Sequence, residues 1–135
     1  ETTMENAGAA LNEPGNGDFL RDDSVVLVVM LTDEDTYGDL TRVQQRQAVL
    51  EAVDGRLDRL LVLSFNGDQG VFEMPKTTCE GPYGKAVPGR RLTSIVYSYR
   101  QQGIVRDLCA GTLGESFESV LDEVVRTCEE YDPEG

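Results

Sequence analysis

The chain contains an unbroken apolar run, residues 25–31, that stops at a cluster of acids and hydroxyls. A valine-rich run of this length is typical of a strand buried on both faces, usually in the middle of a parallel sheet. Open α/β sheets bind their ligands at the carboxyl ends of such strands. Carboxylate oxygens are ligands that suit Mg²⁺ or Ca²⁺. We therefore predict a cation-binding loop after this strand, formed by Thr32, Asp33, Glu34, Asp35 and Thr36.

Composition narrows the class of protein. A chain of 135 residues with 39% apolar residues is expected to fold as a single domain over residues 1–135. A net charge of −13 without histidine argues against nucleic-acid binding, because the phosphate backbone would be repelled. No apolar segment approaches the ~20 residues that span a membrane. The start at Glu1 without a signal segment is expected of a chain whose targeting segment was removed, or of an excised piece.

Helical and strand-like segments alternate along the chain. Thr41 and Gln44 have the spacing of a capping box at the start of a helix. A helix between two apolar strands predicts a βαβ unit with a right-handed crossover. Residues 71–89 read as a long irregular insertion and residues 132–135 as a tail. The predicted helices are 1–11, 40–53, 90–101 and 117–128, and the predicted parallel strands are 25–31, 60–65 and 104–108.

The 3 cysteines lack CxxC spacing, and a zinc site is not expected without histidine. From the residues alone, two arrangements stay open. One is a single disulfide with a spare thiol, which is natural for an exported protein. The other is a set of buried free thiols.

Several short motifs, in this order, resemble the second half of a von Willebrand factor A-like domain. Leu31-Thr32-Asp33 resembles the end of that family's fourth strand. The likeness is closer to exported bacterial variants, in which a Phe-Leu-Arg sequence and an apolar strand precede a run of acids. Over residues 5–130 the matching positions are Phe19, Leu20, Arg21, Asp33, Glu34, Asp35, Cys79, Ala86, Pro88, Arg91, Leu92, Gly103 and Cys109.

The resemblance implies an α/β fold with a three-layer arrangement: a mainly parallel sheet with helices on both faces. The family's Asp-x-Ser-x-Ser loop is absent, so we expect a partial domain that a partner chain or segment completes. The resemblance also implies a divalent cation, Mg²⁺ or Ca²⁺, at Asp33, with Glu34 and Asp35 as further ligands or as groups that tune the site. It implies a Cys79–Cys109 disulfide and a secreted, periplasmic or cell-surface location. Cys128 is then expected to be a buried free thiol.

The leading functional hypothesis is a non-catalytic protein-binding or adhesion module that engages its partner through the cation. We expect no catalytic residues, since the chain has no histidine and no serine elbow. One alternative is a haloacid dehalogenase-like phosphatase using Asp33 and Asp35, with Ser64 in its second motif. Another is a metal-free scaffold. Without the family's first strand, residues 25–31 would have an open edge, so we expect pairing with a partner segment or a homo-oligomer.

Overall fold

The computed structural model describes residues 2–67 and 78–133 and confirms the α/β class. The sheet is parallel, in the order β1-β2-β5, and β3 with β4 forms a separate antiparallel hairpin. The helices are α1 (Thr3–Leu11), α2 (Arg42–Glu51), α3 (Arg90–Tyr97) and α4 (Leu113–Glu130), with short 3₁₀ turns η1 (Pro14–Phe19), η2 (Leu57–Arg59), η3 (Arg100–Gln102) and η4 (Leu108–Ala110). The strands are β1 (Val26–Leu31), β2 (Leu60–Asn66), β3 (Cys79–Gly81), β4 (Gly84–Ala86) and β5 (Gly103–Asp107).

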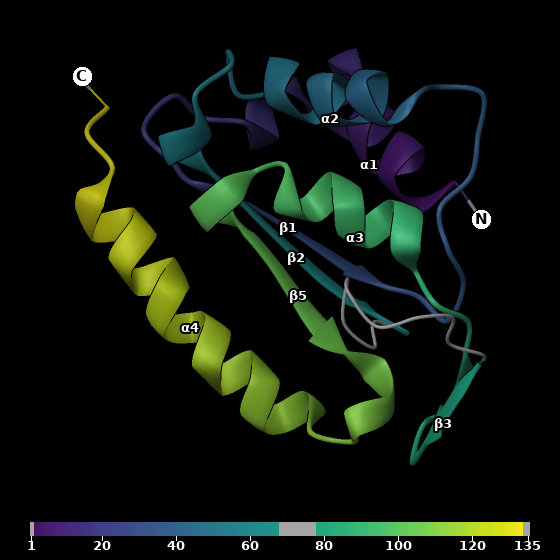
Figure 1. The fold of residues 1–135 in the computed structure, drawn as a ribbon. Coiled ribbons are helices and arrows are strands. Elements are labelled where there is room, and N and C mark those ends of the chain that lie inside the picture. Colours follow the sequence, from purple (N-terminus) through teal and green to yellow (C-terminus); the bar gives the residue numbers. More distant parts are fainter. Residues whose placement is uncertain (1, 68–77, 134–135) are drawn as a thin grey trace.

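Helices α1, α2 and α3 lie together on one side of the sheet (Figure 1). The predicted capping box starts α2: the Thr41 hydroxyl accepts from the Gln44 amide, and the Gln44 side chain accepts from the Thr41 amide. The core on this side joins the three helices to alternate residues of the strands. Its members are Met4, Val26, Val28, Met30, Val49, Leu50, Val53, Leu60, Val62, Leu92, Ile95, Val96, Tyr99 and Val105.

Helix α4 covers the opposite face of the sheet (Figure 1). Val120 is buried there against Leu61, Leu63 and Phe65 of β2. The predicted apolar stripe of this helix is present, but only part of it is buried. Cys128 is exposed, so the prediction of a buried thiol was wrong. The stripe is wider than the surface that the sheet offers it, and Cys128 lies on the part that extends past that surface.

The apolar run alone predicted that residues 25–31 lie in the middle of the sheet, and this was wrong, because β1 is at one end of the sheet order and β2 is the central strand. The open edge expected from the missing family strand is present on β1 among the described residues. All residues of β2 are buried, whereas burial alternates along β1. Side chains of β1 that face α1–α3 are buried. Those on the other face are exposed, because α4 packs over β2 and β5 and leaves β1 uncovered.

The segment predicted as an irregular insertion, residues 71–89, is partly regular. Residues 79–86 contain the β3–β4 hairpin, in which Cys79 pairs with Ala86. Residues 71–77 lie outside the described residues, as do 134–135 of the predicted tail. A cross-link holds the hairpin to the end of β5, as described below. A short hairpin of this kind is only marginally stable alone, so this attachment explains why it forms.

Candidate functional site

The predicted site residues lie at the carboxyl edge of the sheet, in the loop that follows β1. The Thr32 amide donates a hydrogen bond to the Phe65 carbonyl of β2 at 3.0 Å. Its hydroxyl also contacts Glu34, accepting from the Glu34 amide at 3.1 Å. The chain therefore turns tightly as soon as the strand ends. The turn leaves Asp33 and Glu34 exposed and buries Asp35.

The carboxylate of Asp35 is directed at the N-terminus of α3. Its Oδ2 accepts from the Arg91 amide at 2.9 Å, and its Oδ1 accepts from the Leu92 amide at 2.9 Å. Oδ1 also accepts from the Thr36 amide at 2.8 Å. The residue at the cap position of α3, Gly89, has no side chain to perform this task. Asp35 thus caps α3 from a distant loop and places a negative charge at the positive end of the helix dipole.

Sequence reasoning missed this role, although one signal was present. The helix begins Gly-Arg-Arg, with neither a capping side chain nor an acid in its first turn. A helix start of this kind leaves unsatisfied amides that another part of the chain must bind. Asp35 does so across a sequence separation of 56 residues.

The other polar groups near this edge form a buried hydrogen-bonded cluster. The Asn66 side chain donates to the Ser64 hydroxyl at 2.9 Å and to the Thr93 hydroxyl at 3.3 Å. Ser64 and Asn66 are fully buried. This Ser64 hydroxyl is therefore a packing group beneath α3, away from any surface that a phosphate group could reach.

Asp33 lines a small hollow of about 240 Å³ at the same edge, together with the β3–β4 hairpin and η4. Its other lining residues include Tyr83, Lys85 and Cys109, whereas Asp35 is not among them. The two carboxylates of the predicted phosphatase motif therefore do not face one cleft. Asp33 is accessible at the carboxyl edge, as predicted.

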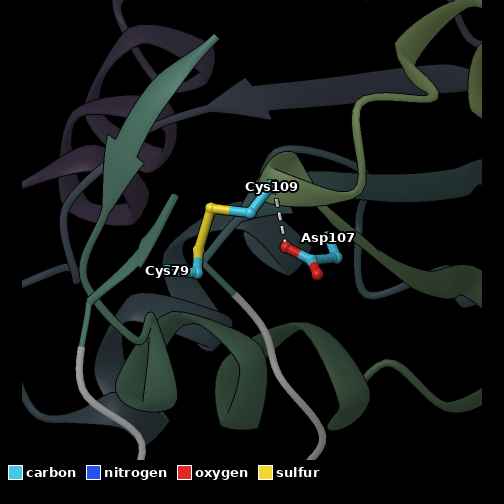
Figure 2. Close-up of side chains that lie close together, drawn as sticks. All are labelled: Cys79, Asp107 and Cys109. Atoms are coloured by element: carbon cyan, nitrogen blue, oxygen red, sulfur yellow. Dashed lines mark hydrogen bonds between the residues drawn. A yellow bond between two sulfur atoms is a disulfide. The ribbon is translucent and has the colours of Figure 1, made fainter. Parts of the chain in front are cut away.

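A disulfide joins Cys79 to Cys109, with their Cα atoms 6.0 Å apart, as the resemblance implied. Figure 2 shows this bond beside Asp107, whose carboxylate accepts from the Cys109 amide at 2.8 Å. Within residues 2–67 and 78–133, Cys79, Asp107 and Cys109 are the one group with metal-ligand atoms within 4.8 Å of one another. The two sulfur atoms are bonded to each other and do not act as thiolate ligands in this state.

The predicted cation ligands Asp33, Glu34 and Asp35 are not such a group in the described part of the chain. Both oxygens of Asp35 already accept backbone hydrogen bonds, and that side chain is 7% exposed. A Ca²⁺ site needs six or more oxygens directed at one point. The donor set in this arrangement does not fit such a site, and the cation stays a prediction.

The uncovered side of β1 is the second notable surface. The Thr32 amide bonds to β2, and successive residues of a strand direct their backbone groups to opposite sides. Leu27, Val29 and Leu31 therefore direct their N–H and C=O groups away from β2. No described strand pairs with them on that side. Their side chains are 43%, 43% and 60% exposed.

Apolar side chains of α4 extend this exposed surface. Phe117, Leu121 and Val125 are 42%, 59% and 55% exposed. The Phe117 ring lies 4.7 Å from that of Phe65, which is the partner of Leu31 in the strand register. We call the combined set the β1–α4 surface: Leu27, Val29, Leu31, Phe117, Leu121 and Val125.

The chain matches no protein-family model, no curated protein and no solved structure. None of the helices in the described ranges is long and apolar enough to cross a membrane. The carboxyl edge is mostly occupied by structural hydrogen bonds. Among the described residues, no strand pairs with the open edge of β1, which also carries exposed apolar side chains.

Proposed function

We propose that the chain is a non-catalytic protein-binding module that engages a partner at the edge of β1. The observation that carries the proposal is the exposed, strand-edge position of Leu27, Val29 and Leu31. An edge of this kind accepts an extended segment by β-strand addition. The main chain of the segment supplies hydrogen bonds, and its alternate side chains meet the exposed face.

The resemblance to the second half of a von Willebrand factor A-like domain supports the same interpretation. In that family another strand lies next to the one that corresponds to β1. The added segment would then complete a partial three-layer domain, on a partner chain or in a second copy. The Cys79–Cys109 disulfide supports a secreted, periplasmic or cell-surface location, because such bonds persist in oxidising compartments.

Strand addition does not require a cation, so this proposal is closer to the metal-free form of the predicted module. Titration of Mg²⁺ and Ca²⁺ against the melting temperature separates the two forms. We expect no shift at millimolar metal, since the Asp35 oxygens are bound to backbone amides. A shift that is lost in Asp33→Asn would instead support the cation-dependent module.

Hydrogen exchange of single amides tests the proposed function directly. The probe is a short synthetic peptide of alternating valine and lysine, which is extended, apolar on one side and opposite in charge to the protein. We expect the amides of Leu27, Val29 and Leu31 to exchange rapidly in the free protein and more slowly with the peptide. The amides of Val28 and Met30 bond to β2 and should be protected in both states.

A matched peptide with proline at its central valine is the control, because proline removes one of the N–H groups that strand addition uses. It should protect the three amides less. Unchanged exchange of Leu27, Val29 and Leu31 with the first peptide would contradict the proposed function. So would strong protection of these amides in the free protein.

A further inference from the structure

Helix α4 lies over β2 and β5 with its two flanks in different surroundings. Arg106 of β5 donates to the Ser119 hydroxyl at 3.4 Å. Glu123 and Arg126 line a hollow of about 480 Å³ with Gly103 and Ile104 of β5. One flank of α4 therefore faces the outer edge of β5. The opposite flank, which carries Leu121 and Val125, faces the side of β1.

On that side the exposed apolar side chains of α4 and β1 form one continuous surface, the β1–α4 surface. Phe117, Leu121 and Val125 follow one another at intervals of four residues and form a ridge along α4. Leu27, Val29 and Leu31 form the floor beside it. Ridges at this spacing are the surfaces by which helices pack against one another. A helix laid beside α4 and over β1 would contact both the ridge and the floor.

The charged side chains that α4 carries next to the β1–α4 surface are acidic. Glu118, Asp122 and Glu129 are exposed on α4 next to the ridge. Arg126, the one basic residue of α4, lies on the other flank, where it pairs with Glu123 at 2.5 Å and Glu130 at 2.7 Å. The acids beside the ridge have no cation on their own helix to neutralise them.

We infer that the partner carries an amphipathic helix that lies along α4 and over β1, with an apolar face on the β1–α4 surface and lysine or arginine facing Glu118, Asp122 and Glu129. This inference rests on the proposed function, since the helix and the added strand occupy the same uncovered side of the sheet. A second copy of this chain fits less well. Each copy has a net charge of −13 and would bring acids against acids.

A designed helical peptide tests the inference on the intact chain. The probe matches α4 in length, 18 residues, and carries leucine on one face and lysine on both flanks. The comparison peptide has glutamate in place of every lysine. We expect the lysine peptide to bind, with an affinity that falls as salt rises, and the glutamate peptide not to bind. Triple replacement Glu118→Gln, Asp122→Asn and Glu129→Gln should weaken binding and flatten the salt dependence.

Two further variants distinguish specific binding at the β1–α4 surface from non-specific binding to exposed apolar residues elsewhere. Leu121→Gln with Val125→Gln should weaken the lysine peptide about tenfold or more, through loss of buried apolar area. Val43→Gln is the matched control, since Val43 is an exposed apolar residue on α2, on the other side of the sheet, and should leave binding unchanged. Circular dichroism should show that the triple variant, the double variant and the Val43→Gln control are all folded.

Equal binding of the two peptides, or an unaffected Leu121→Gln, Val125→Gln variant, would overturn the inference. So would self-association of the wild type that this variant abolishes, because a second copy would then cover the β1–α4 surface. If the strand peptide still protects Leu27, Val29 and Leu31 while no helical peptide binds, the inference fails alone. If neither kind of peptide binds, the proposed function fails with it.

Discussion

The acid Asp35 stabilises the fold by binding the start of α3, and this role can be separated from cation binding. Asp35→Asn should lower the free energy of unfolding by about 1–3 kcal/mol, because an amide accepts through one oxygen only and leaves a buried N–H of α3 unpaired. Urea unfolding measures the change. Asp33→Asn is the control and should stay within about 0.5 kcal/mol, since Asp33 is exposed. Equal losses in the two variants would contradict a capping role.

The buried phenol of Tyr99 gives the stability a dependence on alkaline pH. Burial raises the pKa of Tyr99 above its ordinary value of 10.0, with the nearby Arg46 opposing this only partly. The protonated form is therefore favoured in the folded state. The contribution is fully present below the pKa of the unfolded chain and is lost as pH rises above about 10, because only the unfolded chain then ionises.

Tyr99→Phe isolates that effect. At neutral pH the variant should be about 1 kcal/mol less stable, because it lacks the hydrogen bond from the Tyr99 hydroxyl to the Arg46 carbonyl at 3.2 Å. Above about pH 10 the difference in stability should shrink, because ionisation of Tyr99 in the unfolded chain destabilises the folded wild type and the variant lacks that phenol. Melting temperatures of both proteins across this range provide the test. A difference in melting temperature that is the same at every pH would show that the Tyr99 phenol does not cause the loss of stability at high pH.

At the scale of one element, β1 combines a bonded side and an open side, and proline distinguishes them. Val28→Pro removes an N–H that bonds to β2 and leaves a buried β2 carbonyl unpaired, so it should cost about 1–3 kcal/mol. Val29→Pro removes an N–H that faces the open side, where proline is tolerated, and should cost much less. Thermal unfolding of the two variants makes the comparison. If Val29→Pro is the more harmful of the pair, the edge assignment of β1 is incorrect.

Local signals were sufficient to predict most elements, and long-range contacts explain the failures. The capping box at Thr41 and the apolar run of β1 act within a few residues, so both could be read directly. Whether β1 is central or at an edge depends on which strands lie beside it, and its apolar run is the same in either case. The capping role of Asp35 depends on a residue 56 positions away. The exposure of Cys128 depends on how far the sheet extends beneath α4.

Across the whole molecule, the two faces of the sheet are covered unequally. α1, α2 and α3 bury one face of β1, β2 and β5, whereas α4 alone covers β2 and β5 on the other. This asymmetry leaves the apolar β1–α4 surface exposed on a protein whose net charge is −13. A net charge of this size opposes contact between copies of the chain, and the exposed apolar surface is the one that we propose a basic partner covers. These two properties together support binding to a different protein over self-association.

The disulfide is a contact at the scale of the whole molecule, because it connects the β3–β4 hairpin to the end of β5 across a sequence separation of 30. The double variant Cys79→Ser, Cys109→Ser should lose about 3–4 kcal/mol of unfolding free energy, because the unfolded chain regains the entropy of a closed loop. Denaturant unfolding of the variant and of the wild type, with and without reductant, measures the loss. Cys128→Ser is the matched control, and its exposed thiol should leave stability unchanged. Reductant should bring the wild type to the stability of the double variant. If it does not, the loss in the variant arises from the serine side chains and the cross-link contributes little.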